Sequence, residues 1–152
     1  MHKKIKTIAL QTFATVSFLT LANAALALEF QSIQDLAILY ESQSNTSKKL
    51  YFLPDAMPVE VLVRLPKLTK VRDATGTMGW VENVHLSNIR TVQVISESAN
   101  LYANPDANAP VVAEIGKDVG FYVIDDSTKP WIHVRHIDGA VGYLHISDIW
   151  GM

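Results

Sequence analysis

A short sequence pattern occurs twice in this chain, and it limits the possible folds more than any other feature. The letters KVRD, then two glycines, an aromatic residue and an aliphatic residue, occupy residues 70–81. The letters HVRH, followed by the same classes of residue, occupy residues 133–144, a constant 63 residues later. A repeat of this length is one supersecondary unit, so we expect two copies of a small module in tandem.

Within each copy, apolar residues alternate in the manner of short β-strands. Val59, Val61 and Val63 are separated by single residues, which is the period of a half-buried strand with all three valines on one face. The corresponding residues of the second copy are Val119, Phe121 and Val123. The residues therefore predict an all-β protein.

Each copy also contains a hairpin signal next to the repeated segment. Residues 73–79 include two glycines and no bulky apolar run, so they predict a turn. In the second copy the dipeptide Asp138-Gly139 is the strongest turn signal in the chain. We expect a type I′ turn there, with positive φ at both central residues.

The first 27 residues have the three regions of a secretory signal peptide. A start with three lysines precedes an apolar stretch over residues 8–21, and small residues lead to a cleavage site after Ala27. The apolar stretch is short for a membrane span, and no basic cluster follows it. We predict cleavage after Ala27; cleavage after Ala24 and a retained anchor are the alternatives.

Charge and cysteine content exclude several classes of protein. Residues 28–152 carry 10 Lys and Arg against 15 Asp and Glu, a formal charge of −5. Binding to nucleic acid needs a basic face, so we expect no nucleic-acid partner. The chain has no Cys, which excludes a lipoprotein anchor and disulfides.

No catalytic motif is present in the sequence. Without Cys there is no Cys-His peptidase, and the motifs of serine hydrolases, zinc proteases and nucleotide-binding loops do not occur. His133 and His136 point to opposite sides of a strand, so a zinc site would need His145 or a carboxylate to fold onto one of them. Asp125 and Asp126 could form an acid–base pair, although a solvated turn is favoured. We expect no enzyme activity, metal or cofactor.

The second copy closely resembles the bacterial SH3-like (SH3b) repeat. The resemblance lies in L-Y-x-x-P, then V-x-x-x-V, then W-I-H-V-R-x-x-D-G-x-x-G-Y-L. The first copy, with L-T-K-V-R-D-A-T-G-T-M-G-W-V, resembles a divergent member. Two such repeats behind a signal peptide are similar to small secreted two-SH3 proteins of Gram-negative bacteria. The resemblance implies two tandem SH3-like small barrels, over residues 28–89 and 90–152, and a binding role that is often toward peptidoglycan or peptides.

Three residues of the second copy are the candidate ligand-binding residues. Trp131 and Arg135 share one face of a predicted strand, and Tyr102 lies at the edge of a long loop. Aromatic faces stack on sugars and prolines, and Arg fixes orientation. The first copy has Leu68 in place of Trp131, so the second copy is the better candidate for a groove. The alternative is that Tyr102 and Trp131 close the core and Arg135 is a surface charge.

The sequence therefore predicts a non-catalytic, secreted and periplasmic binding or adaptor module of the cell envelope. Its partner would be peptidoglycan or an envelope protein or peptide, and no stable membrane insertion is expected after cleavage. The alternative is a structural or regulatory subunit that binds an envelope protein through a strand edge, with no cell-wall ligand. An enzyme of unrecognised mechanism is a third possibility.

Overall fold

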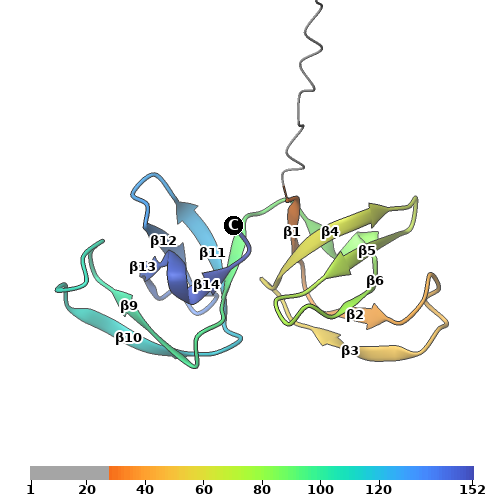
Figure 1. Cartoon of the computed structure of the whole chain (residues 1–152), viewed down its shortest axis with the longest axis horizontal. Coiled ribbons are helices and arrows are strands. Elements are labelled where there is room, and N and C mark those ends of the chain that lie inside the picture. The colour runs from red at the N-terminus through yellow and green to blue at the C-terminus, as the bar shows by residue number, and fades with distance from the viewer. Residues whose placement is uncertain (1–27) are drawn as a thin grey trace, which may run out of the picture.

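The computed structural model describes residues 28–152, which form two antiparallel β-sheets of seven strands each (Figure 1). The all-β prediction is confirmed. The first sheet contains β1 (Phe30–Ile33), β2 (Ala37–Tyr40), β3 (Lys49–Leu53), β4 (Pro58–Arg64), β5 (Leu68–Arg72), β6 (Met78–Glu82) and β7 (Leu86–Ser87). The second contains β8 (Thr91–Val94), β9 (Ser98–Tyr102), β10 (Val111–Gly116), β11 (Gly120–Asp125), β12 (Trp131–Arg135), β13 (Val141–His145) and β14 (Ile149–Trp150). The predicted signal peptide and its cleavage site at Ala27 lie outside the described residues.

The two sheets have the same strand order. The first runs β3-β2-β6-β5-β4-β1-β7, and the second runs β10-β9-β13-β12-β11-β8-β14, so every strand has its counterpart seven numbers later. In both, a short 3₁₀ turn precedes the last strand, at Asn83–His85 and Ile146–Asp148. Below, the first module means residues 28–89 and the second module means residues 90–152. These bounds remain those predicted from the sequence.

Each sheet folds around its own apolar core. The fully buried side chains alternate with outward-facing ones along the central strands, as the period-two pattern predicts. In β12, Ile132 and Val134 are buried, whereas Trp131, His133 and Arg135 face the other side. The larger core residues of the first module are Ile33, Leu39, Leu53, Val59, Val71 and Val81, and those of the second are Val92, Leu101, Phe121, Ile132, Val134 and Leu144.

The prediction that Val59, Val61 and Val63 share one buried face was wrong beyond Val61. Val61 pairs with Val71, but Val63 pairs with the adjacent residue Lys70, so Leu62 is an extra residue in β4. Such a β-bulge moves the following side chains to the opposite face. Val59 is fully buried, whereas Val63 is 45% exposed. β11 has a bulge at the corresponding place, between Val123 and Asp125.

The prediction of a type I′ turn at Asp138-Gly139 was also wrong. Gly139 has a φ of +97°, but Asp138 is not among the residues with positive φ. The Gly139 amide donates to the His136 carbonyl at 3.0 Å, and the His136 amide donates to the Ala140 carbonyl at 2.8 Å. This is the pattern of a three-residue loop with one left-handed glycine, which spares Asp138 a strained conformation. Gly76, with a φ of +88°, closes the hairpin of the first module in the same way.

The second repeated glycine of each hairpin is needed for a close approach between strands. A Cβ on Gly142 would lie 2.7 Å from Leu101 Cγ and 2.7 Å from the carbonyl oxygen of Tyr102. In the first module, a Cβ on Gly79 would lie 2.6 Å from Leu39 Cγ. These distances are too short for a side chain, so the repeated glycines mark the place where β2 crosses β6 and β9 crosses β13.

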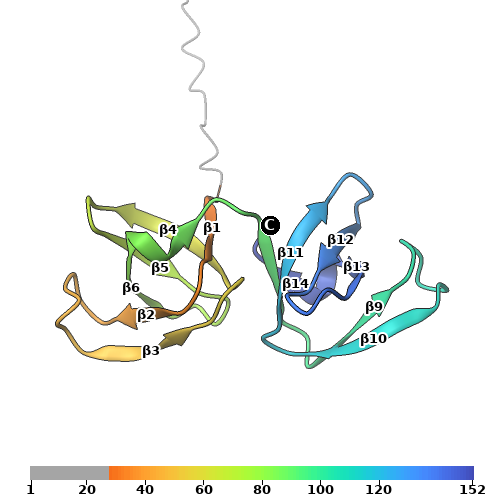
Figure 2. The same cartoon turned by 180° about the vertical axis from the view of Figure 1, so that it is seen from behind.

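The two modules lie side by side with the C-terminus between them, as both views show (Figure 1, Figure 2). The ring of Trp150 lies perpendicular to that of Phe30, with their centroids 5.0 Å apart. The Tyr122 hydroxyl donates to Asp55 Oδ2 at 2.5 Å. Trp150 therefore contributes to the junction between the modules.

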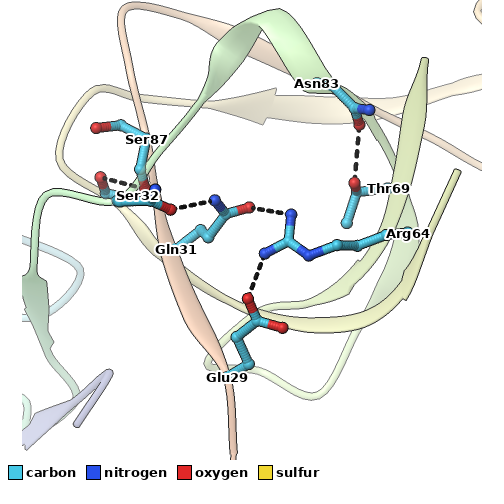
Figure 3. A network of polar contacts seen from close by, with 8 residues as sticks. Glu29, Gln31, Ser32, Arg64, Thr69, Asn83 and Ser87 are labelled. Carbon is cyan, nitrogen blue, oxygen red and sulfur yellow. Dashed lines mark hydrogen bonds and ion pairs between the residues drawn. The ribbon is translucent and has the colours of Figure 1, made fainter. Parts of the chain in front are cut away.

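A polar network fixes β1 against β4 and against the short connection between the modules (Figure 3). Arg64 donates to Gln31 Oε1 at 3.0 Å and forms an ion pair with Glu29. Gln31 Nε2 in turn donates to Asn88 Oδ1 at 2.7 Å. The connection is thus tied to the first sheet by side-chain hydrogen bonds, in addition to being short.

Within residues 28–152, no helix is long and apolar enough to cross a membrane.

Candidate functional site

The structure brings Tyr102 and Trp131 together. Tyr102 ends β9 and Trp131 begins β12, and their rings meet edge to face with centroids 5.2 Å apart and an angle of 79°. Both side chains are half-buried, so each keeps part of its surface open. Edge-to-face aromatic pairs of this kind hold each other in a defined orientation. Two of the three predicted ligand-binding residues therefore contact each other through their rings.

This pair borders a hollow of about 380 Å³ on the second module. Its remaining wall is mostly polar. The lining residues besides Tyr102 and Trp131 are Ser98, Ala99, Asn100, Ala107, His145 and Asp148. Asn100 Nδ2 donates to the Tyr102 hydroxyl at 3.3 Å. A hollow with two aromatic rings and several hydrogen-bonding groups suits a ligand with both apolar and polar faces.

Arg135 does not line this hollow. It lies at the other end of β12, where its guanidinium carbon is 5.4 Å from the ring centroid of Tyr122. Tyr122 in turn donates its hydroxyl to Asp55 of the first module. Arg135 still shares the outward face of β12 with Trp131, so a ligand extended along this strand is the geometry in which both would take part. The ligand-binding role of all three residues remains a prediction.

His145 was not among the ligand-binding residues predicted from the sequence, although its ring joins those of Tyr102 and Trp131 in one aromatic group. Its ring lies 5.0 Å from that of Trp131 at an angle of 75°. In the β12–β13 hairpin Trp131 pairs directly with His145. This register follows from the three-residue loop at 137–139, since the two-residue turn expected at Asp138-Gly139 would have placed Ile146 opposite Trp131. His145 Nδ1 also lies 2.7 Å from the Ser147 hydroxyl, which fixes the orientation of the imidazole.

The remaining aromatic residues of the two hairpins have equivalent positions. Tyr143 pairs with Tyr102, and Trp80 pairs with Tyr40. The Tyr143 ring is stacked on His133, with centroids 4.5 Å apart and an angle of 11°. This supports a packing role for Tyr143 on the outer face of the second sheet.

The first module lacks the aromatic group of the second. Leu68 occupies the position of Trp131 and pairs with Glu82, the counterpart of His145. Tyr40, the counterpart of Tyr102, is only 4% exposed. The first module thus lacks a counterpart of the Tyr102–Trp131 pair, and the expectation of a ligand groove in the second module stays a prediction. In the part of the chain that the structure describes, no group of three His, Cys, Asp or Glu side chains could hold a metal ion.

Burial and a neighbouring carboxylate raise the pKa of two tyrosines near the junction. The hydrogen bond to Asp55, together with partial burial, raises the pKa of Tyr122 to about 12. Burial, followed by the hydrogen bond to Asp73, raises the pKa of Tyr51 to about 12. In both residues the neutral hydroxyl is the form that the fold stabilises.

Comparison with known families identifies the second module. The family model described as "Bacterial SH3 domain" matches residues 96–151. This segment is a bacterial SH3 domain. It contains β9 to β14 together with Tyr102, Trp131 and Arg135, so the predicted resemblance of the second copy is confirmed. The family model matches one domain only, and the first module lies outside the matched residues.

Other comparisons add little beyond this SH3 domain. No curated protein matches the chain. Two solved structures from Trichomonas vaginalis are similar: NlpC2 with 14% identity and a TM-score of 0.37, and NlpC1 with 17% identity and a TM-score of 0.36. The similarity covers 82% and 88% of this chain, which spans 48% and 50% of theirs.

Proposed function

We propose that this protein is a non-catalytic binding module of the bacterial cell envelope, with its ligand site on the SH3 domain. The observation that carries the proposal is the half-buried Tyr102–Trp131 pair beside an open hollow that has both apolar and polar groups in its wall. The family resemblance implies a binding role, often toward peptidoglycan or peptides. The ligand that fits is therefore a fragment of peptidoglycan, whose sugars and stem peptides offer apolar faces next to polar groups.

The chain offers its own variant for testing the site. Leu68 shows that a leucine fits at this position of the fold, so Trp131→Leu should leave the SH3 domain folded. Loss of one stacking aromatic residue should weaken binding by roughly fivefold, since each such contact contributes about 1 kcal/mol. Muropeptides titrated into labelled protein, observed by NMR, measure this change. Binding of the unchanged protein is expected in about the micromolar-to-millimolar range.

A matched control is Trp80→Leu, the same substitution in the first module. Trp80 is half-buried and remote from the hollow, so this variant should alter stability without altering muropeptide binding. Equal binding by the unchanged protein and Trp131→Leu would contradict the proposed site. Shifts confined to the first module would contradict it as well.

Arg135→Ala tests whether the ligand extends along β12. Arg135 is exposed, so its removal should cost little stability. If the ligand follows the outward face of the strand, binding should weaken. If Arg135→Ala leaves binding unchanged while Trp131→Leu weakens it, the site is restricted to the hollow. Arg135 then only packs on the ring of Tyr122.

A second candidate function is binding of an envelope protein through a strand edge. β10 is an edge strand of the second sheet, and its Val111 and Val112 are each 50% exposed. An exposed edge of this kind can accept a further strand from another chain. Crosslinking from β10 in intact envelopes, with no retention of the protein by isolated sacculi, would favour this function.

We propose further that residues 1–27 are a signal peptide and that the protein acts in the periplasm. The support is the sequence pattern of a basic start, an apolar stretch and small residues before Ala27. Intact-mass analysis of an osmotic-shock fraction should show a chain that begins at Leu28. A full-length chain in the membrane fraction would contradict this prediction.

A further inference from the structure

A second hollow lies where the two modules meet, away from Tyr102 and Trp131. It has a volume of about 280 Å³. Tyr51 and Phe52 of β3, and the hairpin turn around Asp73, form its wall on the first module. Gln93 of β8 and Asp118 form its wall on the second module. Only the two modules together build this site.

Gln93 has an unusual position in this hollow. Its side chain is 3% exposed, and its Nε2 donates to Asp118 Oδ1 at 2.9 Å. Its Oε1 is closed to solvent, and no group within residues 28–152 donates a hydrogen bond to it. Buried amide oxygens almost always have a donor, and one without a donor lowers stability. A residue that lines the hollow therefore carries a buried acceptor, just beneath its wall, that no group of the described residues satisfies.

The other polar groups of the hollow are acceptors or are already used. Asp73 Oδ1 accepts from the Thr75 amide at 2.9 Å and from the Thr77 amide at 3.0 Å, and Asp73 Oδ2 accepts from the Tyr51 hydroxyl. Among the described lining residues, Asp73 and Asp118 are acidic and none is basic. The negative charge of the site has no cation within its own wall.

The basic residue next to this wall is engaged elsewhere. Lys117, adjacent to Asp118, forms an ion pair with Glu97 at 2.8 Å. On the apolar side, Phe52 is 62% exposed and Leu53 and Met57 complete the wall. An aliphatic chain can pack against these residues while its end reaches the carboxylates. An aromatic ring beside a carboxylate also favours a cation.

We propose that this junction hollow binds a primary ammonium group carried on an aliphatic chain, as in a lysine side chain. An ammonium has three donors and no acceptor, which matches a site made of acceptors. Asp118 provides the charge, Phe52 and Met57 pack on the aliphatic part, and Gln93 Oε1 accepts a donor. Binding includes a small movement of the Gln93 side chain that opens Oε1 to the ligand.

The experiment uses residues 28–152, which contain every strand of both sheets, and two blocked peptides. One is acetyl-Ala-Lys-Ala-amide, and the other is the same peptide with an acetylated lysine side chain. NMR titration of the first should shift the backbone amides of Gln93, Asp118 and Thr75 and the side-chain amide of Gln93. The acetylated peptide should produce no such shifts, because it lacks the ammonium. Ala-Ala-amide with a free amino end is the control for the aliphatic chain, and its α-ammonium, which has no such chain, should produce smaller shifts than the lysine side chain.

Three variants separate ligand binding from structure. Asp118→Asn removes the charge and should weaken binding of the lysine peptide about fivefold, with a smaller effect at high salt. Gln93→Leu removes the unsatisfied acceptor, so it should weaken binding while thermal stability stays equal or rises. Asp106→Asn makes the same change as Asp118→Asn in an exposed loop and should leave binding unchanged.

The proposal is overturned if the lysine peptide causes no shifts at the junction, or if its acetylated form binds equally well. Shifts at Tyr102 and Trp131 instead would overturn it and assign the peptide to the other hollow. Its failure is independent of the muropeptide site, because the two titrations report on different residues. A Gln93→Leu protein that loses stability but not affinity would mean that Gln93 has a structural role only.

Discussion

At the scale of single residues, two ion pairs of this protein differ in how far their carboxylates are buried. Glu60 has a side chain that is only 7% exposed, and Arg72 Nε donates to its Oε2 at 2.7 Å. Lys117 and Glu97 form an ion pair whose side chains are 47% and 87% exposed. A carboxylate that is removed from water depends on its partner, whereas an exposed pair exchanges its partner for water at little cost.

We therefore expect Arg72→Leu to destabilise the protein more than Lys117→Met. Loss of Arg72 leaves the Glu60 carboxylate buried without a cation, at a cost of about 1.5–3 kcal/mol. Loss of Lys117 should change the free energy of unfolding very little, because both side chains of its ion pair are exposed. Urea unfolding of both variants measures the difference. Equal stability of the two variants would mean that water reaches Glu60.

At the scale of elements, each module uses the same two devices to curve its sheet. A bulge in β4 and in β11 turns the end of the strand, and a left-handed glycine closes the hairpin that follows. Bulges increase the local twist of a strand, which a small sheet needs in order to wrap around a core. The glycines of the repeated sequence pattern therefore mark the same places in both modules. One closes the hairpin turn, and the other lies where two strands approach closely.

Three glycines of the second module should differ in their tolerance of alanine. Gly116→Ala should be nearly neutral, since no atom lies within 4 Å of the new Cβ. Gly139→Ala also has space but keeps a φ of +97°, so it should cost about 1–2 kcal/mol. Gly142→Ala places the Cβ 2.7 Å from Leu101 Cγ and from a backbone oxygen, and should cost most. Thermal unfolding gives the order; a Gly142→Ala protein as stable as Gly116→Ala would contradict the close approach of β9 and β13.

At the scale of the whole molecule, the junction is held by contacts from both ends of the chain. Trp150 packs on Phe30, and Tyr122 donates to Asp55. A Cβ on Gly120 would lie 2.9 Å from the carbonyl oxygen of Ala56, so the second module approaches the first at backbone distance. A small module buries too little surface to be very stable alone, and these contacts add to the stability of both.

The tyrosines of the junction predict how stability depends on pH. Tyr122 and Tyr51 each have a pKa raised to about 12, while an unfolded tyrosine ionises near 10. The unfolded chain therefore loses these protons first, so the stability that they contribute is complete below pH 10 and is lost between pH 10 and 12. Tyr122→Phe should flatten this loss and leave only the part due to Tyr51. Urea midpoints between pH 8 and 11.5 test this, and an unchanged pH dependence would contradict the role of the Tyr122–Asp55 hydrogen bond.

Local features of the sequence determined the all-β class, the burial of Ile132 and Val134 and the glycines of the hairpins. These depend on side-chain alternation and backbone conformation, which neighbouring residues dictate. The bulges could not be predicted, because an extra residue in one strand is recognised only when its residues are paired with those of the neighbouring strand.

Tertiary structure alone decided which distant residues meet. It placed His145 beside Trp131, placed Arg135 over the ring of Tyr122, and brought Gln93 and Asp118 to the wall of the first module. Tyr102 and Trp131 were each chosen from local sequence, but only the folded sheet shows that their rings meet. Contacts between strands far apart in sequence, and between the two modules, follow from how whole sheets pack, and no local pattern of residues specifies them.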